Sequence, residues 1–339
     1  MRTDKKNPID VVVLYVDGSD PVWQKQYKDC GYDISESSGA RFRSNNQFMY
    51  LFRALTQYAP FVNRVFLVVS TESQVPNWIN RDKVTIVTHD QIIPKELLPT
   101  FNSGTIELFI HNIPELSEQF IYCNDDMFFF APTTPSDFFI DGKACIKFQI
   151  RNLKTATTMF RKMCLKDLEL VKDYNVYPAP PEGKYYTPYH VAAPMLKSIN
   201  KQVFDEHTDK IMNSCTRKRN EKNLTQYIYT ESLVFKGMSV DRMPSHKYIE
   251  YTPKKHNEKE IYNFILHNKI KLFCINDTKY TPQNIRDEIV KCFSKRFPNP
   301  CKYENDTVNT VEEKPNIINL ANNETKMKTV VARKFYSYS

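Results

Sequence analysis

Four short apolar runs alternate with helix-like segments before residue 150. The runs are rich in β-branched residues and lie at residues 9–16, 64–70, 84–90 and 119–123. Their length and composition predict buried strands. Between the first two runs, apolar residues recur at helical spacing at Phe48, Leu51, Phe52 and Leu55. We therefore expect a helix over residues 45–58, ended by Pro60, and another over residues 103–112. Strands that alternate with helices predict an α/β fold with a doubly wound, mostly parallel sheet.

The pattern weakens after about residue 150. Residues 177–188 are rich in proline and predict a connection, and the basic segment 216–223 predicts a loop or the exposed end of a helix. Two helical stretches, at residues 258–268 and 282–297, flank a short apolar run that predicts a strand at residues 271–277. The second half of the chain is therefore expected to add helices to the sheet.

The last part of the chain is polar and lacks periodicity. We expect this tail, residues 305–339, to be poorly ordered or to act as a docking arm. The chain then divides into an α/β core at residues 9–150, the remainder of the same domain at residues 151–304, and the tail.

The composition indicates which partners the protein could bind, but it says little about the reaction. A chain of 339 residues can bury a large core, and its formal net charge of +8 indicates anionic partners such as nucleotides, phosphosugars, anionic lipid or nucleic acid. The eight cysteines form no CxxC pair and no metal-finger spacing, so we expect reduced packing residues in a cytoplasmic protein. We recognise no signal peptide and no apolar stretch of about 18 residues, and therefore expect neither secretion nor a membrane span.

Acidic residues follow two of the four predicted strands. Asp17 and Asp20 follow the first strand, and Asp125 and Asp126 follow the fourth. Open α/β sheets bind ligands at the carboxyl ends of their strands, and oxygen-only ligands suit Mg²⁺ or Mn²⁺. Such an ion would offset the repulsion between neighbouring carboxylates and lower their pKa values. The alternative for the adjacent pair is that one aspartate caps a helix and the other is solvated.

Glycine-rich phosphate-binding motifs are absent from the sequence. The chain has only 7 glycines, and it contains no GxGxxG, no GxxxxGK[ST] and no GxSxG. Phosphates would then be held by metal and by side chains, for which the bidentate guanidinium group is suited. The candidates are Arg41 and Arg43 before the first helix and Arg217 and Arg219 downstream. For each of them a solvated basic face is the alternative.

Longer motifs carry a family resemblance. They begin with IDVVVLYVDGSDPVW and RFRSNNQFMYLFRALTQYAPFVNRVFLVVS, continue through a stretch that ends in IYCNDDMFF, and return in YHVAAPMLKS and KLFCINDT. Together they resemble the conserved regions of the Stealth family, which comprises bacterial capsule hexose-1-phosphate transferases and the lysosomal-enzyme N-acetylglucosamine-1-phosphotransferase of animals. The resemblance covers about residues 9–297 and leaves out the tail.

The resemblance implies a fold and a reaction. The fold would be a GT-A-like α/β fold with a mixed sheet, in which residues 9–150 form the nucleotide-sugar-binding core. In the reaction, a sugar hydroxyl attacks the β-phosphorus of a UDP-sugar, so that sugar-1-phosphate is transferred and UMP leaves. The protein would supply in-line positioning, charge neutralisation and a base.

The resemblance also implies roles for residues at matching positions. The catalytic candidates are Asp125, Asp126, His190, Arg217 and Arg219. The candidates for holding Mg²⁺ or Mn²⁺ are Asp125, Asp126, Asn276 and Asp277, of which we favour Asp126 over its neighbour. The candidates for binding the nucleotide sugar or ordering its loops are Asp17, Gly18, Ser19, Asp20, Arg41, Arg43, Asn102, Ser103, Glu107, Asn124 and Lys197. We expect His190 to be the general base, because imidazole accepts a proton near neutral pH.

The sequence departs from the family pattern in several places. The family has Asp-Asn-x-Glu after RFR, a histidine after TFNS and a second aspartate in its fourth region. The corresponding residues here are Ser44, Asn45, Asn46 and Gln47, then Gly104, and then Thr278. A neutral amide cannot act as a carboxylate base, so donor or acceptor choice is altered or activity is reduced. We favour altered specificity, because the DGSD, NDD and His190 elements remain.

The leading hypothesis is a cytoplasmic bacterial capsular or exopolysaccharide phosphotransferase. It would transfer N-acetylhexosamine-1-phosphate from a UDP-sugar donor to an oligosaccharide or polysaccharide acceptor. The alternatives are a GT-A glycosyltransferase that releases UDP and a non-catalytic member that binds UDP-sugar. Nucleic-acid binding has the least support, because the basic residues are scattered and no recognised module is present.

Capsule synthesis takes place at the inner face of the membrane, so peripheral membrane contact is a further hypothesis. The predicted helix 282–297 places Ile285, Ile289, Phe293 and Phe297 on one side, which could touch anionic lipid. The alternative, favoured by base rates, is an amphipathic helix packed on the core.

Overall fold

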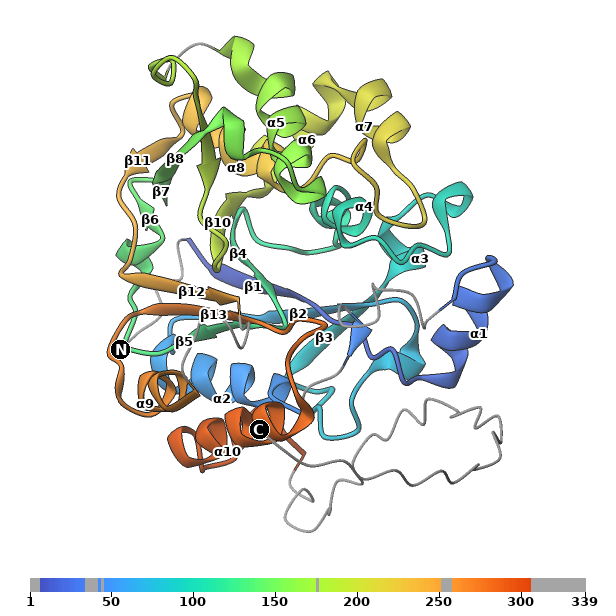
Figure 1. Cartoon of the computed structure of the whole chain (residues 1–339), viewed down its shortest axis with the longest axis vertical. Helices are drawn as coiled ribbons and strands as arrows, with labels where there is room; N and C mark the ends of the chain where they lie inside the picture. The colour runs from blue at the N-terminus through green and yellow to red at the C-terminus, as the bar shows by residue number, and fades with distance from the viewer. Residues whose placement is uncertain (1–6, 34–41, 44–45, 175–176, 251–257, 306–339) are drawn as a thin grey trace, which may run out of the picture.

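A five-stranded mixed sheet forms the centre of the protein (Figure 1). The computed structural model describes residues 7–33, 42–43, 46–174, 177–250 and 258–305. The sheet has the order β10-β4-β1-β2-β3 and consists of β1 (Ile9–Leu14), β2 (Val65–Val69), β3 (Val84–Thr88), β4 (Gln119–Asn124) and β10 (Ala193–Leu196). The first four strands are parallel, and β10 pairs antiparallel with β4 at one edge. All four predicted strands are therefore confirmed.

Helices lie on both sides of this sheet, which explains why β1 and β2 are apolar at almost every position. One side carries α2 (Phe48–Tyr58), α9 (Glu258–His267) and α10 (Gln283–Arg296). The other side carries α4 (Ser103–Glu107), α5 (Met159–Val171), α6 (Lys197–Glu206), α7 (Thr208–Ser214) and α8 (Tyr227–Phe235). Two shorter helices, α1 (Pro21–Asp29) and α3 (His89–Ile92), follow β1 and β3. The expected α/β fold class, with a mixed sheet and helical additions in the C-terminal half, is confirmed.

A second sheet brings distant segments together. It has the order β12-β13-β5 and consists of β5 (Met127–Phe129), β12 (His246–Glu250) and β13 (Leu272–Asn276). Cys274 of β13 pairs antiparallel with Met127, so the chain just after β4 lies beside residues 272–276. The predicted helices and strand in this part of the chain are confirmed.

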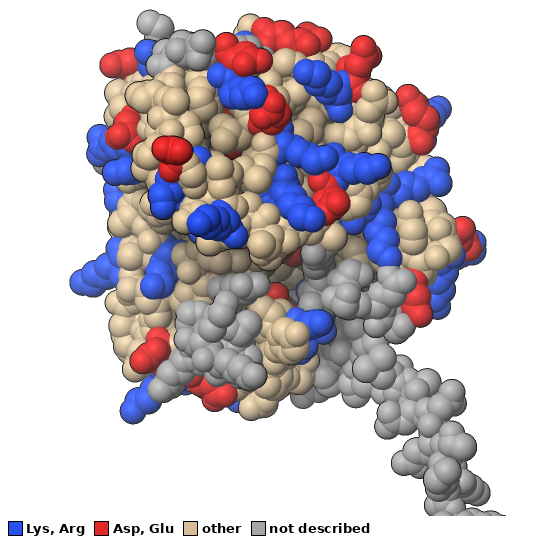
Figure 2. All heavy atoms as spheres, turned by 45° about the horizontal axis from the view of Figure 1, so that its top comes forward, with Lys and Arg blue, Asp and Glu red and all other residues tan. Residues whose placement is uncertain are grey.

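Smaller elements complete the fold. They are β6 (Phe139–Ile140), β7 (Lys143–Ile146), β8 (Phe148–Asn152), β9 (Lys184–Pro188), β11 (Ser239–Asp241) and 3-10 helices at Glu72–Gln74, Lys95–Leu97, Ile110–Asn112, Pro135–Asp137, Leu153–Thr155 and Lys172–Tyr174. The basic segment 216–223 is a loop, as one alternative had it. Lys and Arg side chains gather on the face that carries α5, α6 and α7 (Figure 2).

Two predicted elements need correction. The helix expected over residues 103–112 is divided, because α4 ends at Glu107 and a 3-10 helix covers Ile110–Asn112. The connection expected over residues 177–188 ends in a strand, β9, which pairs with β8 and buries Tyr185 and Tyr186. Two large aromatic side chains in the core stabilise this strand despite the prolines that precede it.

The C-terminal helix α10 packs against the core. Ile285, Ile289, Phe293 and Phe297 are all buried, so this side of the helix packs on the core, which was the favoured alternative to contact with lipid. Within the described residues no helix is long and apolar enough to cross a bilayer. All eight cysteines are free thiols, as expected. The tail beyond Asn305 lies outside the described residues, and the division of the chain at residue 150 stays a prediction.

Candidate active site

The strand order creates a ligand-binding position between β1 and β4. From β1 the chain proceeds to β2 and β3 on one side, and it then returns to place β4 on the other side of β1. Leu14 at the end of β1 pairs with Asn124 at the end of β4, so the loops that follow the two strands start side by side. Open α/β sheets bind ligands at such a switch point. Both predicted acidic clusters therefore lie at the same edge of the sheet.

The loop after β1 is held by its own aspartates. Asp17 accepts hydrogen bonds from the backbone N–H and the hydroxyl of Ser19, at 2.8 and 2.6 Å. Asp20 caps α1 by accepting from the N–H of Val22 at 2.9 Å, and its other oxygen accepts from Gln74 at 2.8 Å. Burial alone would raise the pKa of Asp20, but its hydrogen bonds outweigh burial and lower the pKa. Asp20 is thus a helix cap that fixes the loop, whatever it does with a ligand.

Gly18 joins this loop to the segment before α2. Its N–H donates to the carbonyl oxygen of Phe42 at 2.7 Å, and a Cβ atom at residue 18 would lie only 2.4 Å from the same oxygen. Glycine is needed because the two backbones approach so closely. Arg43, next to Phe42, forms an ion pair with Asp277 at 3.0 Å, while Arg41 lies outside the described residues.

The turn between β4 and β5 places Asp125 and Asp126 beside β13. The carbonyl oxygen of Asp126 accepts from the N–H of Ile275 at 3.1 Å. One ligand atom each of Asp126, His190 and Cys274 lies within 4.8 Å of the others. The Oδ1 atom of Asp126 is buried and has no hydrogen-bond partner among the described residues. A buried carboxylate oxygen without a partner is costly unless a ligand or cation reaches it.

Burial raises the pKa values of both aspartates. Burial raises the pKa of Asp125 to about 8, and the charge of Asp126 adds to the effect. Burial also raises the pKa of Asp126 to about 6. A cation bound between them would lower both values.

The donor set partly fits a divalent cation. Asp125 and Asp126 offer oxygen ligands, and Mg²⁺ is commonly held by one or two carboxylates together with the phosphates of a substrate. His190 and Cys274 offer nitrogen and sulphur, which are less suited to Mg²⁺. Of the other two expected ligands, Asn276 donates through its amide nitrogen to the hydroxyl of Tyr248, which leaves its amide oxygen for a cation, whereas Asp277 is paired with two arginines, Arg43 and Arg286. The two aspartates offer the oxygen chemistry that the expected ion prefers, and Asp126 is the one that groups with His190 and Cys274.

His190 lies between β9 and β10 with its ring facing aromatic neighbours. Its Nδ1 lies 3.3 Å from the hydroxyl of Tyr227, and Tyr248 packs edge-on at 5.6 Å between ring centroids. Burial lowers the pKa of His190 to about 4, and the positive charges of Arg219 and Arg161 contribute. The ring is neutral at pH 7 and free of a proton on one nitrogen. An anion that neutralises the two arginines would make it a stronger base.

The segment 102–107 and the basic loop hold each other. Asn102 is fully buried, caps α4 by accepting from Gly104 N–H at 3.1 Å, and donates to the carbonyl oxygen of Thr216 at 3.3 Å. Arg219 donates to the hydroxyl of Ser103. Arg217 is exposed and donates to the carbonyl oxygen of Leu98 at 3.0 Å. Arg219 is therefore the arginine of the loop that faces the site, and Asn102 orders the loop.

Glu107 belongs to a buried polar chain that ends at the site. The hydroxyl of Tyr122 lies 3.0 Å from Oε1 of Glu107 and 2.5 Å from Oδ1 of Asn124. A phenol has one proton, so it donates to only one of them. Burial raises the pKa of Glu107, against the charge of Arg219, and a protonated Glu107 can donate to Tyr122 while Tyr122 donates to Asn124. The chain fixes the orientation of Asn124, next to Asp125.

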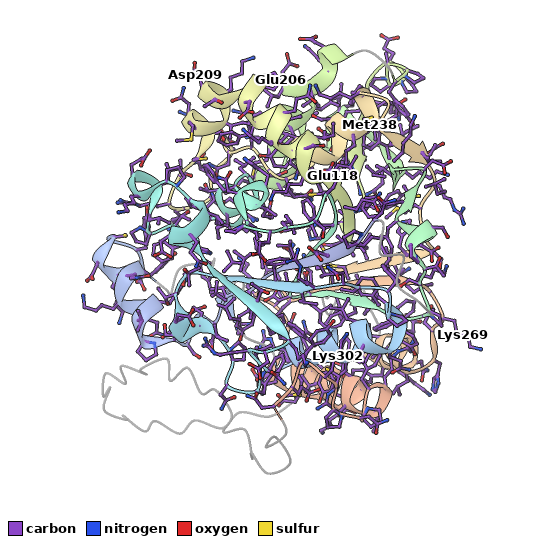
Figure 3. All side chains as sticks on the ribbon, turned by 180° about the vertical axis from the view of Figure 1, so that it is seen from behind. Glu118, Glu206, Asp209, Met238, Lys269 and Lys302 are labelled. Atoms are coloured by element: carbon purple, nitrogen blue, oxygen red, sulfur yellow. The ribbon has the colours of Figure 1, made fainter. Side chains whose placement is uncertain are left out.

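Lys197 lies at the other end of the sheet. Its Nζ donates to the carbonyl oxygen of Ile113 at 3.0 Å, and its N–H donates to the carbonyl of Glu118, which is labelled in Figure 3. Because Leu196 pairs with Gln119 at the start of β4, the whole strand separates Lys197 from the acidic turn, about 20 Å for six residues. The structure does not bring Lys197 to the other candidates.

The residues that depart from the family pattern have different structural surroundings. Gln47 borders a cavity of about 20 Å³ beside Asn276 and Asp277. A Cβ at Gly104 would lie 2.9 Å from the carbonyl oxygen of Leu224, so a histidine there would require the segment around Leu224 to move. Thr278 donates its N–H to Asp277 at 2.8 Å. Ser44 and Asn45 lie outside the described residues, and Asn46 is exposed.

Several residues near the site escaped the reasoning from sequence. They are Cys274, Tyr122, Tyr227, Tyr248 and Arg161. Tyr122 could have been found, because it is two residues before Asn124 on the same strand and so shares its face. Cys274 precedes Asn276 in the CIND motif by the same interval.

Comparison with known proteins identifies the family of this chain. The family description "Stealth protein CR2, conserved region 2" matches residues 41–162. An exopolysaccharide phosphotransferase of Lactiplantibacillus plantarum, cps2G, is 32% identical, and the match covers 90% of this chain and 98% of the relative. The chain belongs to the Stealth family.

Other Stealth relatives match over similar lengths. A capsular polysaccharide phosphotransferase of Haemophilus influenzae, fcs1, is 32% identical over 80% of this chain and 78% of its own length. Among solved structures, the galactosyltransferase LgtC in complex with donor and acceptor sugar analogues covers 83% of this chain and 95% of its own, with 10% identity and a TM-score of 0.36.

Proposed function

We propose that this Stealth protein is a transferase that moves sugar-1-phosphate from a UDP-sugar to a sugar hydroxyl. The donor sugar is an N-acetylhexosamine, the acceptor is an oligosaccharide or polysaccharide of a capsule or exopolysaccharide, and the reaction takes place in the cytoplasm. The names of the Stealth relatives support phosphoryl transfer. The observation that carries the proposal is the convergence of the NDD turn, His190 and Arg219 at the switch point of the sheet.

The bond changes follow from this arrangement. The acceptor oxygen attacks the β-phosphorus, the bond from that phosphorus to the bridging oxygen of the α-phosphate breaks, and UMP leaves with the electron pair. His190 takes the proton of the acceptor hydroxyl through the nitrogen that does not face Tyr227. Arg219 binds the oxygens of the transferred phosphate, and its charge favours the added negative charge of the transition state.

Asp125 and Asp126 would hold the divalent cation, Mg²⁺ or Mn²⁺. When bound, the ion would neutralise the diphosphate charge and orient it for in-line attack. The two aspartates lie in the turn between β4, which pairs with β1, and β5, which pairs with β13. These pairings limit the movement of the turn. Asn276 would keep its amide oxygen for the ion, whereas Asp277 would support the site through its ion pair with Arg43.

The remaining candidates surround the donor. Asp17, Gly18 and Ser19 would contact the nucleotide through the loop that Asp20 caps. Ser103 and Asn124 would contact sugar hydroxyls, while Asn102 and Glu107 keep these two residues in place. Gln47, Gly104 and Thr278 alter the neighbourhood of the site relative to the family, and we propose that they change the choice of donor or acceptor.

The test is product analysis with matched variants. We expect the purified chain, incubated with Mg²⁺ or Mn²⁺, a panel of UDP-sugars and oligosaccharide acceptors, to release UMP and form a phosphodiester. His190→Ala should abolish release, whereas His267→Ala, an exposed histidine on α9, should not. Full activity in chelator would remove the role of the ion. UDP-sugar binding without turnover on every acceptor would favour a non-catalytic member instead.

A further inference from the structure

A second hollow lies outside the candidate active site. It has a volume of about 740 Å³ and lies between α5, α7 and residues 222–224. Leu170, Val171 and Leu224 give it an apolar floor. This volume is within the range of pockets that bind small ligands or parts of larger ones. None of the residues to which we assign catalysis or donor binding lines it.

Lysines surround this hollow. Lys166, Lys172, Lys210 and Lys222 are all exposed at its rim, with Glu169 and Asp173 as the acidic residues. We call it the lysine pocket. Its face is the one on which basic side chains gather in Figure 2. The pocket therefore favours an anion.

Three of the four lysines form no ion pair with an acidic side chain of the described residues, although the charges of Lys166 and Lys222, after that of Lys162, help to lower the pKa of Glu221. Lys172 pairs with Glu169 at 2.6 Å. No ion pair joins Lys166, Lys210 or Lys222 to an acidic side chain in the part of the chain that the structure describes. Their ammonium groups are thus available to phosphate oxygens.

The lysine pocket and the active site share a wall. Lys222 belongs to the same loop as Arg219, and three peptide units allow their Cα atoms to be at most about 11 Å apart. Leu224 on the floor of the pocket presents its carbonyl oxygen to Gly104, next to Ser103. The next residue, Thr225, is fixed by hydrogen bonds to Asp167 of α5 at 2.8 and 2.6 Å. An extended ligand could lie over this loop with one end in each place.

We propose that the lysine pocket binds the anionic sugar-phosphate chain that the active site extends. This inference rests on the proposed function, because a sugar-1-phosphate transferase makes a polymer with one negative charge per repeat. The lysines would bind phosphodiesters already formed, and the apolar floor would contact the less polar faces of the sugars. The pocket thereby selects a charged acceptor over a neutral one.

Other anionic partners fit the lysine pocket less well. A bilayer surface is flat and cannot reach the floor of a hollow. Single-stranded nucleic acid is usually bound with several aromatic residues that stack on successive bases, and among the described residues that line the pocket only His207 carries an aromatic ring. A flexible chain of sugars and phosphates meets neither obstacle.

The direct test is binding, without chemistry. The probe is a fluorescent oligomer of phosphodiester-linked N-acetylhexosamine, measured by anisotropy against the full chain, with a neutral oligosaccharide of equal length for comparison. We expect the variant Lys166→Gln/Lys210→Gln/Lys222→Gln to bind the charged oligomer about tenfold to a hundredfold more weakly, given the strength of exposed charge pairs. The neutral oligosaccharide should bind equally to both proteins.

A control variant removes the same charge elsewhere. Lys95→Gln/Lys269→Gln/Lys302→Gln changes three exposed lysines, of which Lys269 and Lys302 are labelled in Figure 3, far from α7. This variant should bind like the wild type. Equal binding by the pocket variant and the wild type, or equal weakening in both variants, would overturn the proposal. So would tighter binding of anionic vesicles or single-stranded DNA than of the oligomer.

Transfer assays separate this inference from the proposed function. With a short neutral acceptor, the pocket variant should release UMP at the wild-type rate. With the charged oligomer as acceptor, its KM should rise while kcat is kept. Absence of transfer by the wild type would refute the proposed function, but the binding result would still decide on the lysine pocket. Equal KM values in variant and wild type would refute the inference alone.

Discussion

Replacing Asp126 by asparagine should lower activity and raise stability. The charge of Asp126 would attract a bound cation a few ångströms away, and at 4 Å with an effective dielectric constant of about 20 this is worth about 4 kcal/mol. Since roughly 1.4 kcal/mol is a factor of ten, kcat/KM should fall about a thousandfold. The pKa of Asp126 is raised to about 6 by burial, so its charge costs stability as pH rises from the unfolded-state value through 6. At pH 8 the Asp126→Asn protein should therefore be more stable by about 1–3 kcal/mol.

Two assays read the two effects. UMP release measured by chromatography gives kcat/KM, and thermal unfolding at pH 8 gives the change in stability. Asp125→Asn is the matched control, because it removes a neighbouring carboxyl group but not one of the two side chains, Asp126 and Cys274, that converge with His190. It should gain stability and lose less activity. A kcat/KM for Asp126→Asn within threefold of wild type would refute the reasoning, and so would a loss of activity that merely follows a loss of stability.

Three further predictions concern the frame of the site. Gly18→Ala would place Cβ 2.4 Å from the carbonyl oxygen of Phe42, so we expect a loss of about 1–3 kcal/mol and weaker UDP-sugar binding; an unchanged melting temperature would contradict this. Burial raises the pKa of Asp137, but hydrogen bonds from Lys271 at 2.7 Å lower it overall. Asp137→Asn should therefore lower the free energy of unfolding by about 1–3 kcal/mol at pH 7. The difference from the wild type should shrink below about pH 4. Denaturant unfolding at pH 7 and pH 3 measures it, and an equal cost at both would refute the ion pair as the cause. Glu231 is fully buried, its carboxylate oxygens have no hydrogen-bond partner among the described residues, and burial raises its pKa. The free energy of unfolding of the wild type should therefore fall by up to about 1.4 kcal/mol per pH unit above about pH 4.5. Glu231→Gln should reduce that slope.

The strands were predictable because burial on both faces makes them apolar throughout. The acidic residues after β1 and β4 could be identified as candidates for the same reason, because each follows directly after an apolar run. Their adjacency was not visible, because it depends on the strand order, and only the pairing of Leu14 with Asn124 brings the two loops together. The Pro-rich stretch before β9 concealed a strand that is stabilised by packing of Tyr185 and Tyr186 rather than by local preference.

Closeness in sequence did not indicate which residues lie together at the site. Lys197 is seven residues from His190 in the same motif, but β10 lies between them and an extended chain carries them roughly 20 Å apart. Asp277 follows Asn276 at the end of β13, yet it is engaged by Arg286, nine residues later, and by Arg43 from a distant segment, which its neighbours in sequence do not indicate. His190 and Cys274 meet Asp126 through tertiary packing, so only the family resemblance indicated that His190 belongs to the site.

The identity of the leaving nucleotide tests the central claim most directly. The chain is incubated with a UDP-N-acetylhexosamine labelled in its β-phosphate, a divalent cation and an oligosaccharide acceptor, and the products are analysed by mass spectrometry. The account predicts UMP and a phosphodiester in which the acceptor carries the labelled phosphate. Release of UDP, with the label in the nucleotide and a glycoside as the product, would contradict it.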